Sequence, residues 1–106
     1  MSESNVTINA AGTKIWRNKA GEYHRLDGPA IERPDGTKKW YQNGRLHRID
    51  GPAIEWANGH VIWHYLGKRL GHSLEGFWAL WNLLNEEERQ DVNLHMWLEK
   101  LTVGQF

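Results

Sequence analysis

The fold is decided by the stretch from Gly44 to Gly59, Gly-Arg-Leu-His-Arg-Ile-Asp-Gly-Pro-Ala-Ile-Glu-Trp-Ala-Asn-Gly, because nearly the same string occurs one repeat earlier. The earlier copy runs from Gly21 to Gly36, and both copies share the core His-Arg-x-Asp-Gly-Pro-Ala-Ile-Glu. A string that recurs at this interval indicates one small supersecondary element that is stacked on itself.

Tryptophan marks the same position in three successive units, at Trp16, Trp40 and Trp63. β-Prone runs in the units flank a short turn signal, which is Asp35-Gly36 in one unit and Asn58-Gly59 in the next. Such dipeptides favour hairpins with type I′ turns, and the Gly-Pro of the shared core ends ladder hydrogen bonding between hairpins. The pattern therefore predicts a meander of short antiparallel strands.

After the repeats, the composition changes to helix-forming residues. We expect a first helix that is capped by Ser73 and ends at about Leu84, because apolar residues recur there at helical spacing. Asn85 is followed three residues later by Glu88, which is a capping box and predicts a second helix to about Leu101.

The expected fold class is α+β, with an antiparallel β-hairpin repeat sheet followed by a C-terminal helical hairpin in a single domain. A flexible N-terminus covers residues 1–5, the β-hairpin repeat region covers 6–71 and the helical hairpin covers 72–106. We expect the helices to pack on the sheet or to cap its end, because the last repeat of an array leaves apolar surface uncovered. Trp97 is expected to lie in the core.

Composition and charge bear on the class of protein and on its partners. The 106 residues contain no cysteine, so neither a disulfide framework nor a thiolate metal site is expected. Lys+Arg and Asp+Glu number 13 each, so the whole chain has no net attraction for nucleic acid or an anionic membrane. The polar start from Met1 to Asn5 does not resemble a signal peptide, and no apolar run approaches the roughly 20 residues that span a bilayer. We expect a cytoplasmic protein with no membrane contact.

The motif order resembles that of hairpin repeat proteins from bacteriophage genomes: a tryptophan, Asn-Gly, His-Arg-x-Asp-Gly-Pro-Ala, and then Asp-Gly or Asn-Gly. It is more loosely similar to that of MORN-repeat variants, whose units of this length are also hairpins punctuated by glycine. The resemblance extends from about Val6 to Leu70 and does not include the helices. It implies a β-hairpin array used for protein contacts, and a small viral effector that acts in the host cytoplasm.

The shared motif contains the most enzyme-like residues of the chain. A histidine near an aspartate could act as a base, and two such pairs could hold a metal ion. We favour a structural role within the connector, which is the segment that contains His-Arg-x-Asp-Gly-Pro and joins one hairpin to the next. In this role arginine pairs with aspartate and polar groups satisfy the backbone of the connector, because an active site normally needs one asymmetric constellation. No catalytic residue, metal site, cofactor or enzymatic activity is therefore predicted. The structural motif residues are His24, Arg25, Asp27, Gly28 and Pro29 in one copy, and His47, Arg48, Asp50, Gly51 and Pro52 in the other.

Aromatic side chains outside the repeated tryptophan position are predicted to bind a partner, because tryptophan is enriched in binding hot spots. Trp56 has Arg33 as its counterpart in the other copy, so the repeat does not require an aromatic residue there. The tryptophans at the repeated position are expected to be stacked core. The predicted partner-binding residues are Tyr41, Trp56, Trp78 and Trp81.

The expected partner is a host protein, which a rigid sheet with an apolar helical anchor would inhibit or redirect by steric occlusion. A homodimer through the C-terminal helices is an alternative, since two-fold pairing would bury their excess apolar surface. Nucleic-acid binding is a second alternative, in which bases stack on a basic sheet face that contains Trp16, Trp40, Tyr41 and Trp63.

Overall fold

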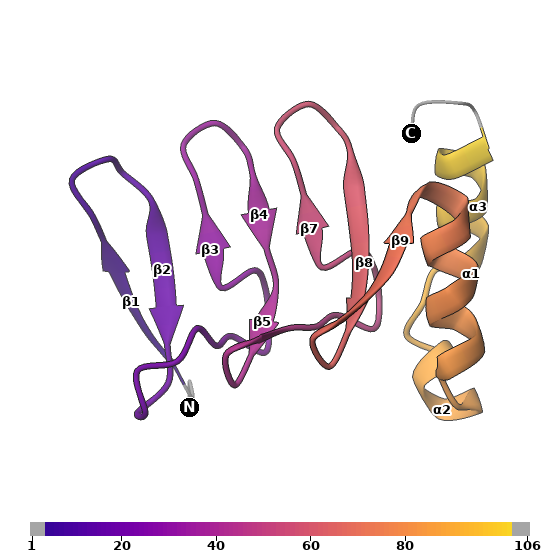
Figure 1. Cartoon of the computed structure of the whole chain (residues 1–106), viewed down its shortest axis with the longest axis horizontal. Coiled ribbons are helices and arrows are strands. Elements are labelled where there is room, and N and C mark those ends of the chain that lie inside the picture. The colour runs from indigo at the N-terminus through magenta and orange to yellow at the C-terminus, as the bar shows by residue number, and fades with distance from the viewer. Residues whose placement is uncertain (1–3, 103–106) are drawn as a thin grey trace.

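The computed structural model describes residues 4–102, in which nine strands are followed by three helices (Figure 1). The strands are β1 (Asn5–Ile8), β2 (Lys14–Arg17), β3 (Ile31–Glu32), β4 (Lys38–Lys39), β5 (Tyr41–Gln42), β6 (Arg45–Leu46), β7 (Ile54–Glu55), β8 (Val61–Tyr65) and β9 (Lys68–His72). The helices are α1 (Ser73–Leu83), α2 (Glu86–Arg89) and α3 (Leu94–Thr102). Residues 1–3 of the predicted flexible N-terminus and residues 103–106 of the predicted helical segment lie outside the described residues.

Seven of these strands form one antiparallel sheet in the order β1-β2-β3-β4-β7-β8-β9, and β5 pairs with β6 in a separate two-stranded ribbon. Figure 1 shows the hairpins β1-β2, β3-β4 and β7-β8 standing side by side, with the connectors at one end of the sheet. The predicted α+β fold, a meander of hairpins followed by helices, is confirmed.

The hairpin turns at Asp35-Gly36 and Asn58-Gly59 are not the predicted type I′ turns. Gly36 and Gly59 have positive φ values of 98° and 93°, but neither Asp35 nor Asn58 is among the described residues with positive φ. The Asp35 carboxylate instead accepts a hydrogen bond from the N–H of Thr37 at 2.8 Å. Each turn therefore has a single left-handed glycine, and the side chain before it stabilises the turn locally.

The two faces of the sheet differ because successive strand residues point to opposite sides. One cross-strand row lies on a face that we call the open face, and it consists of Ile15, Ile31, Lys39, Ile54 and Ile62. The neighbouring row lies on the opposite face, called the connector face, and consists of Lys14, Glu32, Lys38, Glu55 and Val61. Opposite charges alternate along most of the second row, and such cross-strand pairs stabilise a sheet.

The helices cap the C-terminal end of the sheet, beyond β9 (Figure 1). Helix α1 packs against β8 and β9, and α3 packs against α1. Trp97 is only 3% exposed, which confirms the prediction that it belongs to the core. The buried residues of this core are Val61, Trp63, Phe77, Leu80, Leu84, Val92, Trp97 and Leu101.

Two helix predictions are wrong in detail. The N-cap of α1 is His72, whose side chain makes no capping hydrogen bond, and Ser73 is already the first helical residue with a φ of 56°. The predicted second helix is divided into α2 and α3, because the Asn93 side chain accepts a hydrogen bond from the N–H of Met96 at 2.9 Å and starts a new helix. This break allows Val92 to enter the core.

The capping box at the start of α2 is confirmed. The Asn85 side chain accepts from the N–H of Glu88 at 2.8 Å, and the Glu88 carboxylate accepts from the N–H of Asn85 at 3.0 Å. Both bonds satisfy N–H groups that the helix itself leaves without partners.

Candidate binding surfaces

The first connector folds an arginine back over the tryptophan of its own hairpin. The Arg25 guanidinium carbon lies 3.9 Å from the centre of the Trp16 ring. Its Nε donates to Asp27 at 3.0 Å, and one terminal nitrogen donates to Glu32 at 3.1 Å and to the carbonyl of Pro29 at 3.2 Å. The group is thus stacked and bonded at once, which arginine allows because its donors form a rigid planar fork.

The second connector repeats this geometry. Arg48 lies 3.9 Å from the centre of the Trp40 ring and donates to Asp50 and Glu55, each at 2.8 Å, and to the carbonyl of Pro52 at 3.1 Å. The arginine–aspartate pairing that the repeat predicts is therefore present in both copies.

The glycine of each motif makes room for the guanidinium. A Cβ on Gly28 would lie 2.8 Å from the guanidinium carbon of Arg25, and a Cβ on Gly51 would also clash with Arg48. Because no real Cβ tolerates such a contact, a larger residue would displace the arginine from the tryptophan. The recurrence of glycine after the aspartate thus has a packing reason.

The two motif histidines each hold the turn of the next unit. His24 Nδ1 accepts a hydrogen bond from the N–H of Asn43 at 3.0 Å, and His47 Nδ1 accepts from that of Leu66 at 2.9 Å. Both side chains are buried, and burial lowers the pKa of His47. A neutral imidazole can accept at Nδ1 whereas a protonated one cannot, so the contact agrees with this direction.

In the third unit, side chains of the helices cover the repeated tryptophan, whereas an arginine covers it in the first two units. Trp63 is fully buried, and its ring lies 5.4 Å from that of Phe77 and 5.2 Å from that of Trp97. The Trp97 indole also donates from Nε1 to the carbonyl of Asp50 at 3.1 Å, which ties α3 to the second connector. Of the tryptophans predicted to be stacked core, Trp63 is buried, whereas those at the other two repeat positions are partly exposed beside their guanidinium groups.

The open face carries an exposed tryptophan beside a cavity. Trp56 is 37% exposed, and Lys39 Nζ lies 5.2 Å from the centre of its ring. A cavity of about 340 Å³ adjoins this tryptophan. Its lining residues are Trp56, His60, Val61, Ile62, Arg69, His72 and Ser73.

Cations gather on the open face, whereas the strand glutamates Glu32 and Glu55 lie on the connector face. Besides Lys39 and Arg69, the open face includes Arg17, which is two residues along β2 from Ile15, and Arg33, which lines a second cavity with Ile15 and Ile31. Asp35 also lines that cavity, and the bond that it accepts from Thr37 lowers the pKa of its carboxyl. The open face therefore combines partly exposed isoleucines with positive charge.

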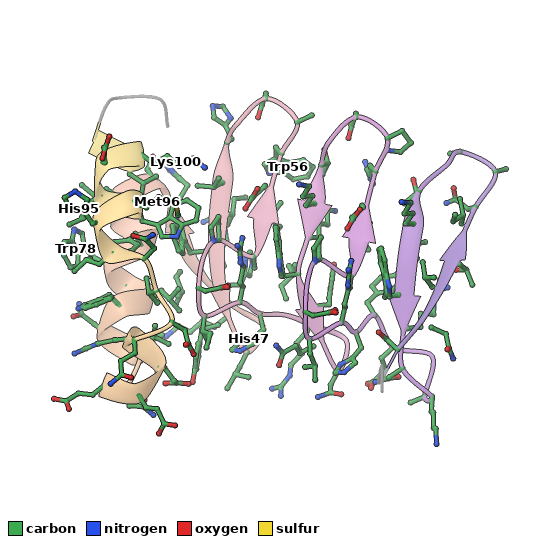
Figure 2. The ribbon with its side chains drawn as sticks, turned by 180° about the vertical axis from the view of Figure 1, so that it is seen from behind. His47, Trp56, Trp78, His95, Met96 and Lys100 are labelled. Atoms are coloured by element: carbon green, nitrogen blue, oxygen red, sulfur yellow. The ribbon has the colours of Figure 1, made fainter. Side chains whose placement is uncertain are left out.

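The structure does not bring the four predicted partner-binding aromatics together. Figure 2 shows Trp56 on the sheet and Trp78 on the outer side of the helices, where it is 40% exposed. Trp81 is partly buried, with its ring centre 6.2 Å from that of Phe77, and Tyr41 is partly buried against Tyr23 at 5.1 Å.

Sequence reasoning predicted a basic sheet face that contains Trp16, Trp40, Tyr41 and Trp63, but it missed that cations gather beside Trp56. Arg17, Lys39 and Arg69 come from three separate strands, and only the register shows that they share a side with Trp56. The available signal was the period of two along each strand, which separates Lys38 from Lys39.

Comparisons with protein-family models, with curated proteins and with solved structures give no match to this chain. Within residues 4–102, no cluster of three or more histidine, aspartate or glutamate side chains is placed to hold a metal ion. None of the helices that the structure describes is long and apolar enough to span a membrane.

Proposed function

We propose that this chain is a protein-binding module whose open face binds an acidic, partly apolar segment of another protein. The observation that carries the proposal is the gathering of cations around partly exposed isoleucines and Trp56 on one face. Such a combination offers an aromatic anchor with arginines nearby, and tryptophan and arginine are the residues most enriched in binding hot spots.

Charge selects the partner in this proposal. The connector face uses its acids internally, since Glu32 and Glu55 are bonded to Arg25 and Arg48. Arg69, Lys39 and the other cations of the open face therefore favour acidic side chains on the partner, while the cavity beside Trp56 accepts an apolar side chain.

The resemblance to phage-type repeats makes a host protein the partner that we propose. The mechanism is steric occlusion: the sheet covers a surface that the host protein needs for another contact. Such inhibition requires tight, geometrically defined binding and no chemical step.

Affinity capture with matched tryptophan variants tests the proposal. Tagged protein is used to capture partners from a bacterial lysate treated with nuclease, in parallel with Trp56→Ala and with Trp78→Ala, an equally exposed control. We expect one protein at a fixed ratio on the wild type and on Trp78→Ala, with retention at least about 10-fold weaker on Trp56→Ala. Retention that depends on Trp78 but not on Trp56 would contradict the assignment of the open face.

Nucleic-acid binding is a second candidate, which the cations and Trp56 on the open face also favour. Two of its predicted stacking residues, Trp16 and Trp40, are less suited to the task, because a guanidinium occupies one face of each indole. Binding of a single-stranded oligonucleotide that weakens steeply with salt and is lost in Arg69→Glu would favour this candidate.

A further inference from the structure

The first strand of the sheet lies at an edge that no other element covers among residues 4–102. Figure 1 shows β1 as the outermost strand, at the opposite end of the sheet from the helices. Its residues are exposed along the whole strand, including Val6 at 49% and Ile8 at 64%. The array is therefore capped at one end and bare at the other among the residues that the structure describes.

Natural sheets usually protect their edges with lysine, proline, a bulge or a covering element. β1 consists of Asn5, Val6, Thr7 and Ile8, so it contains neither a charge nor a proline. Its four residues pair with β2 in continuous register, without a bulge. An uncharged edge without a bulge, with exposed Val6 and Ile8, is a template for another strand.

The backbone groups of Val6 and Ile8 point away from the sheet. The N–H of Asn9 donates to the carbonyl of Thr13 at 3.1 Å, which makes these two residues a hydrogen-bonded pair. Such pairs alternate along antiparallel strands, so Thr7 also bonds toward β2 and the residues on either side of it bond outward. Their donors and acceptors are directed at whatever lies beside β1.

The sequence of this edge is nearly the same in both directions, because Asn5-Val6-Thr7-Ile8-Asn9 has Thr7 at its centre. An antiparallel pair of two such segments, centred on Thr7, places Val6 opposite Ile8 of the other copy twice. The outward-directed backbone groups of Val6 and Ile8 then face those of Ile8 and Val6 of the other copy. The apolar side chains of the same residues face each other on the connector face.

We infer that β1 pairs with β1 of a second copy of this chain, in antiparallel register about Thr7. The two seven-stranded sheets join into one continuous sheet, and the helices of both copies lie at its outer ends. The two-fold axis of an antiparallel strand pair is perpendicular to the sheet, so both open faces lie on the same side. The surface is separate from the one in the proposed function, and the pairing does not depend on it.

Solution mass, measured by light scattering, tests this pairing with two matched substitutions. Ile8→Lys places a charge opposite Val6 of the other copy, whereas Leu83→Lys places the same charge on an exposed position of α1. We expect the wild type and Leu83→Lys to be dimers and Ile8→Lys to be a monomer with an unchanged circular dichroism spectrum. A monomeric wild type at high micromolar concentration, or a dimer that only Leu83→Lys dissociates, would overturn the inference.

A single cysteine tests the register, since the chain has none of its own. At the two-fold axis, Thr7 faces Thr7 of the other copy as a non-hydrogen-bonded pair with Cα atoms about 4.5 Å apart, which a disulfide can bridge. We expect Thr7→Cys to form a covalent dimer under mild oxidation, and Ala10→Cys, at an exposed position after β1, to remain uncrosslinked. Equal crosslinking of the two variants, or none with Thr7→Cys, would refute the register.

Discussion

Replacement of Trp97 by alanine tests whether the helices are an integral cap of the repeat array. The indole is 3% exposed and lies edge-on to the Trp63 ring, with 5.2 Å between the ring centres. Its Nε1 donates to the carbonyl of Asp50 at 3.1 Å, so the side chain joins α3, β8 and the second connector. The substitution removes both contacts and leaves a cavity at the junction of these elements.

The expected loss can be worked from the buried surface. A buried aromatic side chain of this kind covers about 150–250 Å², which at about 25 cal/mol per Å² corresponds to about 4–6 kcal/mol. Because the unfolded chain already covers part of that surface, the contribution falls to about 3–5 kcal/mol, which matches measured losses for large-to-small core substitutions. The figure counts buried surface alone, and the lost hydrogen bond to the Asp50 carbonyl adds about 1 kcal/mol to it.

Urea denaturation followed by circular dichroism measures the change in free energy of unfolding. Trp78→Ala is the matched control, because its indole is on the same helical cap but 40% exposed, and we expect it to cost about 1–2 kcal/mol. A loss below about 1 kcal/mol for Trp97→Ala would refute the reasoning. It would mean that the helices contribute little to the stability of the sheet.

Three further predictions follow from the connectors and the cap. Arg48→Lys lowers the free energy of unfolding in urea by about 1–3 kcal/mol, because lysine lacks the planar fork that bonds three acceptors while it stacks on Trp40. The control Arg45→Lys, at an exposed position, changes this free energy by less than about 0.5 kcal/mol. Burial holds the pKa of His47 below its ordinary value, so the unfolded state takes up a proton more readily and the free energy of unfolding falls as the pH drops through about 6.5. In denaturation curves measured across pH, His47→Gln should remove part of this dependence, and a gain in stability on acidification would contradict the prediction. Gly76→Ala lowers the melting temperature despite the better helix propensity of alanine, because its Cβ would clash with the Gly71 carbonyl and the Trp63 ring; an increase would show that the helix can shift.

Much of the fold was predictable because its signals are local. The repeated motif, the Asp-Gly and Asn-Gly turns and the capping box of Asn85 with Glu88 each act over a few residues, and each has its expected place in the structure. The errors concern the residues at which helices begin, which tertiary packing decided. Helix α3 begins after Asn93, which caps it, and the break before it allows Val92 to enter the core. Helix α1 starts at Ser73 without a side-chain cap because β9 leads straight into it.

The candidate binding surface was less predictable. Trp56 was found from its departure from the repeat, but the cations beside it come from strands far apart in the sequence. The sequence assigned all four predicted aromatics to partner binding, whereas the structure divides them between the sheet, the helices and partly buried positions.

The sequence by itself determined the repeat, the hairpins, the arginine–aspartate pairs of the connectors and the presence of a helical cap. These features depend on contacts within one unit, where turn chemistry and strand alternation are sufficient. Only the tertiary structure decided which face the connectors cover, that Trp63 is enclosed by Phe77 and Trp97, and that β1 remains at an edge. These depend on the pairing of strands and helices that are distant in the chain, and no local pattern specifies that pairing.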